Sequence, residues 1–553
     1  MKKTALSIAL AISLTGSIAL GEVDSKSPNI LLIVADDLGY SDISPFGGEI
    51  PTPNLQTLAD EGLKFSQYYT APMSAPARSM MLTGNSNHEA GMGAMWWYDS
   101  TQNEIGYELR LTDRVTTMPE IFQKNGYETL MAGKWHVGYN HGASPDERGF
   151  IRSFALMGGG ASHFDDIAPL GEIEKFHTYY TKNGDRIDHL PSDFYSSTFY
   201  TQQLNEWIIE TPEDKPIFAY LAYTAPHDPI QAPDEWISKF KEEYKEGYDP
   251  IFKARMEQLH SLGFLSDDIP MLDLKLEERW NQLSVDEKRK ETKRMQVYAA
   301  MVSHMDSQIG SVFQTLKETG RYDNTVIIFL SDNGANPGGR ELYDEDEYWN
   351  KQNLDNSVEN IGRKRSFESV GANWADVNNA PYNTLHKTTT AQGGINTNFI
   401  IAGPMLDEGE RGSIKRQYVS VSDLAPTLYE IAGIDVESSL KRNTQLPIRG
   451  VSQKSIITGE SDIPVRRAFA LELHNQSVYI DGDWKIRRVS NVYPQGIAGE
   501  WGIFNIKKDP LEIHNLVEVQ EERLQEMLIK YQIFADESFV IEAEGDFIPY
   551  VGE

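Results

Sequence analysis

The sequence contains no cysteine among its 553 residues. A disulfide framework, a thiolate metal site and a lipid-modified cysteine are therefore excluded. Positive charge is also scarce, because 51 Lys and Arg residues stand against 82 Asp and Glu residues and give a formal net charge of −31. Such an acidic chain is a poor partner for nucleic acid or an anionic membrane. An anionic ligand would have to bind where basic residues gather locally.

Long apolar runs are also missing after the first residues of the chain. Lys2 and Lys3 precede an apolar run from Ala5 to Leu20, and Gly21 follows. A basic start, a short apolar core and small residues at the exit are typical of a secretory signal peptide. The run is shorter than the about 20 strongly apolar residues of a membrane span. We expect a periplasmic or secreted bacterial protein, cleaved near Gly21, without a membrane anchor.

Four apolar runs have the length and composition of buried strands, at residues 30–34, 127–131, 217–223 and 326–330. Helix-like segments lie between them, for example one that begins after Thr117 and ends before Gly126. This alternation predicts an α/β fold, in which helices flank a mixed, mostly parallel sheet.

Each of the four runs is followed closely by polar or ionisable residues. These are Asp36 and Asp37, Lys134 and His136, His227 and Asp228, and Asp332 and Asn333. Ligands of such sheets bind beyond the carboxyl ends of the strands. We therefore expect these side chains to converge on one rim of the sheet.

The length of the chain exceeds what one hydrophobic core usually supports, so two domains are expected. After a signal peptide at 1–21 we predict a catalytic domain at 22–455, with a charged helical insertion at about 233–293. A smaller domain at 456–553 should hold short antiparallel strands closed by a helix near 521–534.

The segment Ser74-Ala75-Pro76-Ala77-Arg78, continuing to Gly84, carries the most specific signal. Taken alone, it is equally compatible with a loop before an ordinary helix. It resembles the signature of the type I sulfatases, formylglycine-dependent enzymes of the alkaline phosphatase superfamily. In that family the first residue, Cys or Ser, is oxidised to formylglycine, whose hydrate is the nucleophile. The resemblance implies that Ser74 is the precursor of this group.

The pairs Asp36-Asp37 and Asp332-Asn333 offer four oxygen donors, which suit a hard cation such as Ca²⁺ or Mg²⁺. The resemblance implies that they hold one divalent ion, which also contacts the formylglycine made from Ser74. We favour Ca²⁺ over Mg²⁺.

Basic residues match further positions of the family. Arg78 would hold the hydrated aldehyde and bind a sulfate oxygen. In the sequence Gly-Lys-Trp-His, Lys134 would contact the sulfate and His136 the formylglycine hydroxyl. Residues two apart on an extended segment point to the same side, so Lys134 and His136 can share a face.

Three more roles follow from the resemblance. His227 would protonate the leaving oxygen as general acid. Lys387 would be a second lysine on the sulfate, and Asp332 the base that deprotonates the hydrate. His136 would then help the aldehyde to re-form. We interpret His88, His304 and His386 as surface or core residues.

The similarity is greatest to the bacterial arylsulfatases, on the segments 91–93, 248–263, 295–306 and 379–382. Serine at position 74 implies maturation by a radical formylglycine-generating enzyme before export. We expect hydrolysis of aryl sulfates to a phenol and sulfate. The alternatives are a carbohydrate sulfatase with the same mechanism, a phosphoryl or phosphonate ester hydrolase of the superfamily, and a non-catalytic sulfated-glycan binder if Ser74 stays unmodified.

Overall fold

A computed structural model of the chain describes residues 27–95, 104–139, 142–166, 178–338, 354–382, 386–440, 445–463, 468–489 and 499–541. The expected signal peptide at 1–21 lies outside these residues. No helix in the described part is both long and apolar enough to span a membrane.

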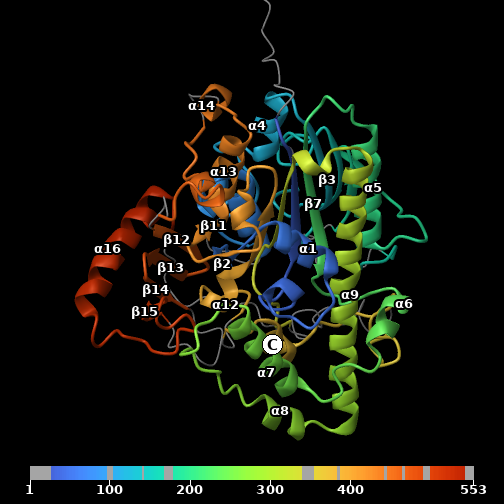
Figure 1. Cartoon of the computed structure of the whole chain (residues 1–553), viewed down its shortest axis with the longest axis vertical. Helices are drawn as coiled ribbons and strands as arrows, with labels where there is room; N and C mark the ends of the chain where they lie inside the picture. The colour runs from blue at the N-terminus through green and yellow to red at the C-terminus, as the bar shows by residue number, and fades with distance from the viewer. Residues whose placement is uncertain are drawn as a thin grey trace, which may run out of the picture.

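One large sheet forms the centre of the molecule (Figure 1). Its strands are β1 (Asn29–Asp36), β2 (Leu63–Tyr69), β3 (Glu128–Lys134), β4 (Arg152–Leu156), β5 (Tyr180–Lys182), β6 (Asp185–Ile187), β7 (Ile217–Pro226), β8 (Thr325–Ser331), β9 (Asn396–Ala402), β10 (Ile414–Lys415) and β11 (Val419–Ser420). They follow the order β10-β2-β9-β8-β1-β7-β3-β4-β5-β6, and β11 also pairs with β2. The central strands β8, β1, β7, β3 and β4 are parallel, whereas β9 and β5 pair antiparallel with their neighbours. The predicted mixed, mostly parallel sheet is confirmed.

Helices cover both faces of this sheet. The helices of the described residues are α1 (Pro53–Glu61), α2 (Ser74–Thr83), α3 (Asn87–Ala90), α4 (Met118–Lys124), α5 (Ser196–Glu210), α6 (Asp234–Ile237), α7 (Tyr248–Ser261), α8 (Leu276–Gln282), α9 (Val285–Glu318), α11 (Ala372–Asn378), α12 (Gln392–Ile395), α13 (Leu424–Ile431), α14 (Val436–Ser439), α15 (Lys454–Ile457) and α16 (Glu521–Glu537).

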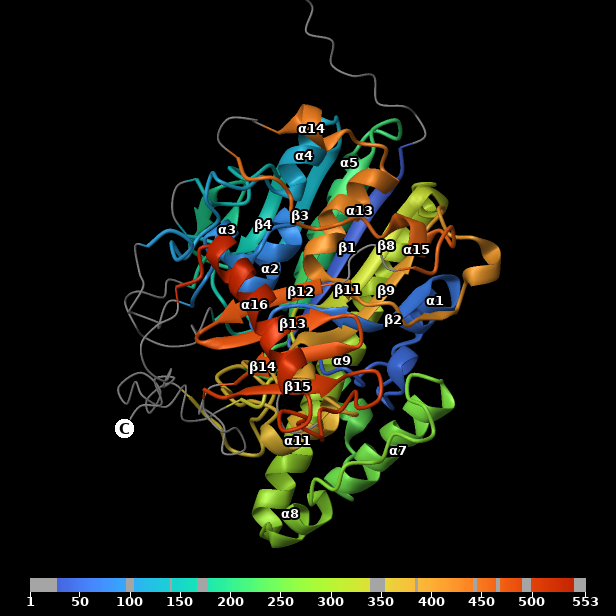
Figure 2. The same ribbon diagram turned by 90° about the vertical axis from the view of Figure 1, so that its left-hand side faces the viewer.

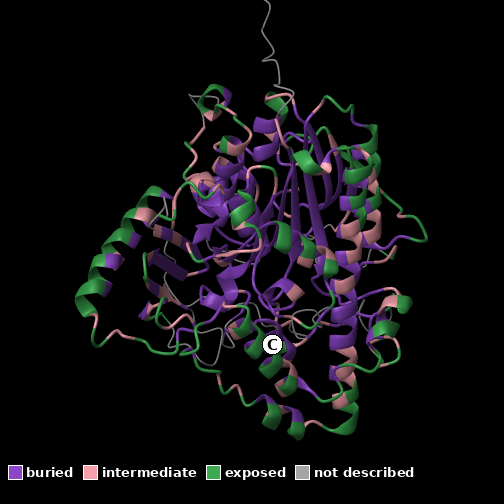
Figure 3. Cartoon of the chain, in the orientation of Figure 1, coloured by how far each residue is buried: buried purple, intermediate pink, exposed green. Residues whose placement is uncertain are grey.

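The strand β1 shows how the core divides. Leu31 and Ile33 belong to the apolar cluster that contains α1, α5 and α9, whereas Leu32 and Val34 belong to the cluster that contains α2, α4 and α13. Alternate side chains of a strand point to opposite faces, so both faces of β1 are buried. Figure 3 shows the central strands buried and the exposed residues concentrated on the outer helices.

The helix ends follow local sequence signals. At α4, Thr117 and Glu120 form a capping box, and Pro119 occupies the first turn, where its missing N–H leaves no hydrogen bond unmade. The long helix α9 also begins with a capping box, which is formed by Ser284 and Glu287. Its apolar face packs against α5 and β7 in one cluster.

A second, antiparallel sheet lies beside the large one, with the order β12 (Ala468–Leu473), β13 (Gln476–Asp481), β14 (Trp484–Arg488) and β15 (Trp501–Asn505) (Figure 2). One face packs on α16, where Tyr479 and Ile486 meet Leu524. The other face joins the core beneath α13 through Leu471 and Val478. This confirms the expected small sheet and helix. The predicted domain limits at 22, 455 and 456 remain predictions.

Buried neutral histidines should make the fold sensitive to acid. Burial lowers the pKa of His304 to about 4, with Lys239 adding to the effect, although an exposed imidazole titrates near 6.5. The unfolded chain therefore binds a proton between these values that the folded chain does not. The free energy of unfolding should fall as the pH drops from 6.5 toward 4, by up to about 1.4 kcal/mol per pH unit for this residue.

Urea unfolding of the wild type and of His304→Gln between these pH values measures the effect. The variant should show the shallower pH dependence. An unchanged slope would mean that His304 is already protonated in the folded protein.

Candidate active site

The site forms where four central strands end. Ala35 of β1 pairs with Ser331 of β8, and Asp36 pairs with Pro226 of β7. Residue 133 of β3 pairs with residue 222 of β7. Because these strands are parallel, the residues that follow them share one edge of the sheet, and the structure brings the side chains expected there together.

Ser74 begins α2, and its preceding residue is still extended. Its side chain is nearly inaccessible, and its Oγ donates to Asp36 Oδ1 over 3.0 Å and lies 3.3 Å from Asn333 Oδ1. Lys134 Nζ donates to the same Oγ over 3.2 Å. The amino end of a helix carries positive partial charge. Oxygen at this position therefore lies where negative charge is stabilised.

Carboxylate and amide oxygens surround this serine. Asp37 Oδ1 accepts from Asn333 Nδ2 over 2.7 Å, and the amide of Asp37 donates to Asp332 Oδ1 over 3.4 Å. Among the described residues, one acidic and histidine group has the spacing of a metal site, namely Asp36, Asp37 and His227, with ligand atoms within 4.8 Å of one another. Buried oxygen donors of this kind fit a hard divalent cation.

Three basic side chains balance the three carboxylates. Arg78 Nη2 lies 2.8 Å from Asp332 Oδ2, Lys134 Nζ lies 2.5 Å from Asp36 Oδ2, and Lys387 Nζ lies 2.6 Å from Asp37 Oδ1. All six side chains are at least nine-tenths buried. Burial of unpaired ions would cost several kcal/mol each, so the pairs depend on one another.

The pKa directions agree with this pairing for Lys387 and Arg78 but not for Lys134. Although burial works in the opposite direction, Asp37 and Asp36 raise the pKa of Lys387. Burial also opposes the charge of Arg78, but Tyr220, Asp332 and Asp36 raise its pKa. For Lys134 burial dominates over Asp36, and the pKa is lowered.

The two histidines of the site differ. Despite burial, Asp37 raises the pKa of His227, whose Nε2 lies 3.4 Å from Asp37 Oδ2 and whose Nδ1 donates to the Asp228 carbonyl over 2.6 Å. Burial and the nearby Lys134 and Arg78 hold the pKa of His136 well below its usual value. His227 is therefore suited to donate a proton, whereas His136 is held in the neutral form.

From the sequence, Lys134 and His136 were expected to face the same side of one extended segment. The structure places His136 at the site in a different way. Lys134 ends β3, and the backbone of His136 is left-handed, with φ of 57°. Its ring lies against Gly159, where an added Cβ would come 2.9 Å from the ring. The turn and the glycine position the imidazole, whose Nδ1 has no hydrogen-bond partner in the described part of the chain.

Several neighbours of the site were not expected from the sequence. The Tyr220 hydroxyl accepts from Arg78 Nη1 over 3.1 Å. His163 Nε2 donates to the carbonyl of His227 over 3.0 Å, and its Nδ1 lies 2.7 Å from Ser196 Oγ. These contacts join residues far apart in the chain, and no local pattern marks them.

The small sheet also reaches the site. Its strand β12 contributes Glu472, which lies 2.8 Å from His88 Nε2. Gln476 Nε2 donates to the carbonyl of Thr388, next to Lys387. His88 is thus a core residue with a specific partner. His386 is likewise buried, 2.7 Å from Asp376.

Comparison with known protein families and sequences gives a consistent result. The sequence model of the family described as Sulfatase matches residues 28–434. A protein named Arylsulfatase from Klebsiella aerogenes is 55% identical over 457 residues, which cover 82% of this chain and 97% of that protein. An uncharacterised sulfatase of Schizosaccharomyces pombe is 36% identical over 95% of this chain and 97% of its own length.

Solved structures share the fold at lower identity. Ps i-CgsB, solved in complex with k-i-k-neocarrahexaose, is 24% identical with a TM-score of 0.64 and covers 92% of this chain and 93% of its own. The PsFucS1 sulfatase from Pseudoalteromonas sp. is 19% identical with a TM-score of 0.60 and covers 94% of this chain and 92% of its own.

The oxygen cluster should bind a divalent cation and gain stability from it. At a Ca²⁺ concentration of about 100 times its dissociation constant, the wild type should gain about 2.7 kcal/mol of unfolding free energy. Asp37→Asn should abolish this gain, because it removes a charged donor. Asp306→Asn is the matched control and should keep the gain, because Asp306 of α9 is a buried carboxylate that accepts from the amide of Leu55 in α1.

Thermal unfolding with and without Ca²⁺, after treatment with a chelator, measures both variants. A full cation-dependent gain in Asp37→Asn would reject the metal assignment.

Proposed function

The chain belongs to the sulfatase family, whose members hydrolyse sulfate esters, and we propose that it acts on aryl sulfates, releasing a phenol and sulfate. The observation that carries this proposal is the surrounding of Ser74. A hydroxyl at the amino end of α2 contacts a carboxylate, an amide oxygen and a buried ammonium group. No ordinary structural serine needs that set of partners.

Two observations favour an aryl substrate over a carbohydrate. The relative at 55% identity is named Arylsulfatase. The residues on either side of Ser74 belong to a buried apolar cluster with Met92, Met95 and Leu473. Methionine side chains contact aromatic rings favourably. The solved structure that holds k-i-k-neocarrahexaose shares the fold only, so the carbohydrate alternative has less support.

In the proposed site, two groups are not encoded amino acids: a modified residue and a metal ion. Formylglycine, formed from Ser74, would supply the oxygen nucleophile that a serine hydroxyl cannot provide at neutral pH. A divalent cation, for which we favour Ca²⁺, would be held by Asp36, Asp37, Asp332 and Asn333 and would supply positive charge at the reacting oxygen. The charge balance of the site supports it, because a cation offsets the anionic ester where the three ion pairs of the site balance one another.

The chain's own basic residues bind the sulfate group. Arg78, Lys134 and Lys387 reach the carboxylates around Ser74 from α2, β3 and the loop before α12. Their charges are pre-arranged by the carboxylates, so binding requires little reorganisation. Asp332 orients Arg78 through Oδ2, and we assign it the removal of a proton from the hydrated group at position 74.

We assign the proton transfers to the two histidines of the site. We assign to His227 the protonation of the leaving oxygen, in keeping with its raised pKa and with the contact between its Nδ1 and the Asp228 carbonyl. His136, kept neutral by its surroundings, would take up a proton when the aldehyde is restored.

The proposal also includes the export of the protein and the modification of Ser74 in the cell. The segment 1–21 would direct export to the bacterial periplasm or beyond, and a radical formylglycine-generating enzyme would modify Ser74 before export. A serine at this position supports the radical route, since the chain offers no cysteine there.

Modification of Ser74 tests the function directly. In protein from the native host, the peptide with residue 74 should be lighter by two hydrogen atoms in mass spectrometry. Ser74→Ala should lose aryl sulfate turnover and keep its fold. Ser79→Ala, one turn further along the same helix and equally buried, is the control and should remain active. Active wild-type protein with unmodified serine throughout would refute the mechanism.

Leaving-group chemistry tests His227. A phenoxide of low pKa needs little protonation, whereas an alkoxide needs a full proton. His227→Ala should therefore lose about 10²- to 10⁴-fold in kcat on alkyl sulfates and far less on nitrophenyl sulfate. His304→Gln, a buried histidine of α9, is the control and should affect both substrates equally. Equal losses in His227→Ala would remove its assignment as the acid.

A further inference from the structure

The loop that follows Asp36 and Asp37 needs external support. Asp37 adopts a left-handed backbone with φ of 66°, which is costly for a residue other than glycine and persists only when its surroundings hold it. Two residues later, the amide of Gly39 donates to Asp42 Oδ2 over 2.8 Å. Asp42 therefore closes the first turn of the loop on which Asp37 lies.

A buried arginine of the helical insertion holds this turn. Arg255 of α7 is 1% exposed, and its Nη1 donates to Asp42 Oδ1 over 2.7 Å. Its Nε and Nη2 donate to the two oxygens of Glu49 over 2.7 and 2.9 Å. A planar guanidinium can make this forked contact, which a lysine cannot reproduce. Arg255 thus ties both ends of the segment 42–49 to α7.

Neighbouring elements complete the support. The hydroxyl of Tyr298, on α9, donates to Asp42 Oδ2 over 2.6 Å. A Cβ added to Gly39 would lie 2.3 Å from the carbonyl oxygen of Asn378, so the loop is pressed against the end of α11. The loop is therefore fixed by charge on one side and by close backbone contact on the other.

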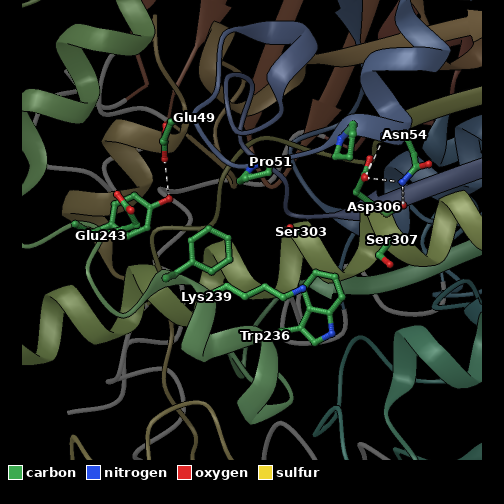
Figure 4. A pocket seen from close by; sticks show the side chains of 12 residues that line it. Glu49, Pro51, Asn54, Trp236, Lys239, Glu243, Ser303, Asp306 and Ser307 are labelled. Atoms are coloured by element: carbon green, nitrogen blue, oxygen red, sulfur yellow. Dashed lines mark hydrogen bonds between the residues drawn. The ribbon is translucent and has the colours of Figure 1, made fainter.

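The two carboxylates held by Arg255 differ in exposure. Asp42 is fully buried, whereas the side chain of Glu49 is 32% exposed. Figure 4 shows Glu49 beside a cavity of 560 Å³ that Pro51, Trp236 and Lys239 also line. Burial raises the pKa of Asp42 even with Arg255 beside it, whereas Arg255 outweighs burial at Glu49 and lowers its pKa. Because Asp42 is buried, water cannot replace the contact between Arg255 and Asp42 when Arg255 is substituted.

We propose that Arg255 is a positioning residue for the divalent cation, because it holds Asp37 in its ligand orientation through Asp42 and Gly39. The inference rests on the proposed function, in which Asp37 is a cation ligand. On its other side Asp37 contacts Asn333 and Lys387, both within the site. Arg255 restrains Asp37 from outside the site. The helical insertion therefore contributes to cation binding.

The test is cation affinity in the full chain without any substrate. Isothermal titration of metal-stripped protein with Ca²⁺ should show weaker binding for Arg255→Lys, by at most the about 10- to 100-fold that is lost when a direct partner of a metal ligand is removed, because Arg255 acts on Asp37 through Asp42. In the cation-free protein, hydrogen exchange at the amides of Gly39 and Asp42 should be faster in this variant. Both readouts are independent of formylglycine and of turnover.

Arg321→Lys is the matched control. Arg321 is also buried, but it binds backbone carbonyls beside the amino ends of β1, β7 and β8, at the opposite edge of the sheet. Its replacement should lower stability and leave Ca²⁺ affinity unchanged. If Arg255→Lys does not fold, Tyr298→Phe removes one hydrogen bond to Asp42 and should weaken binding in the same direction.

Four outcomes decide the question. Weaker binding in Arg255→Lys, with unchanged affinity in Arg321→Lys, supports the inference, and wild-type affinity in the folded Arg255→Lys protein overturns it. If Arg255→Lys does not fold, Tyr298→Phe decides in the same way. An equal loss in Arg321→Lys also overturns it, because general destabilisation would then explain the effect. A wild-type protein that binds no divalent cation rejects the metal in the proposed function, and this inference with it.

Discussion

Mutual neutralisation of buried charges holds the site together. Three carboxylates and three basic side chains meet in a volume that water hardly reaches, and each would be costly to bury without its partner. The pairing of Arg78 with Asp332, and of Lys387 with Asp37, therefore fixes both members at once. When these three pairs balance one another, a divalent cation and an anionic ester can enter together, because the charge of the ester partly offsets that of the cation.

The fold holds the loops at the carboxyl ends of the strands in fixed positions. Parallel strands bring their carboxyl ends to one edge, so residues separated by hundreds of positions become neighbours. The loops beyond that edge are then braced from two sides. Arg255 of α7 holds the loop after β1. On the other side Gln476 holds the carbonyl next to Lys387, and Glu512 Oε2 accepts from the amide of Gln392 at the start of α12.

Much of this arrangement could be predicted from local signals. The strand at 30–34 is an unbroken apolar run, which predicts a strand buried on both faces, and β1 is one. The capping residues around Thr117 predicted the start of α4. The prediction was less complete at His136, because a left-handed residue and a distant glycine decide its direction. The start of α2 at Ser74 itself was also not predicted, because the motif taken alone was equally compatible with a loop before a helix.

The sequence by itself determined the family, the alternation of strands and helices, and the residue types that gather at the strand ends, because apolar periodicity and short motifs are local properties. Only the tertiary structure decided which distant groups support them. Arg255, His163 and Glu472 were ordinary residues in the sequence, and each gained a role through a partner far along the chain. Burial decides whether such a charge is a solvated surface group or part of a fixed network, and burial is a property of the folded chain.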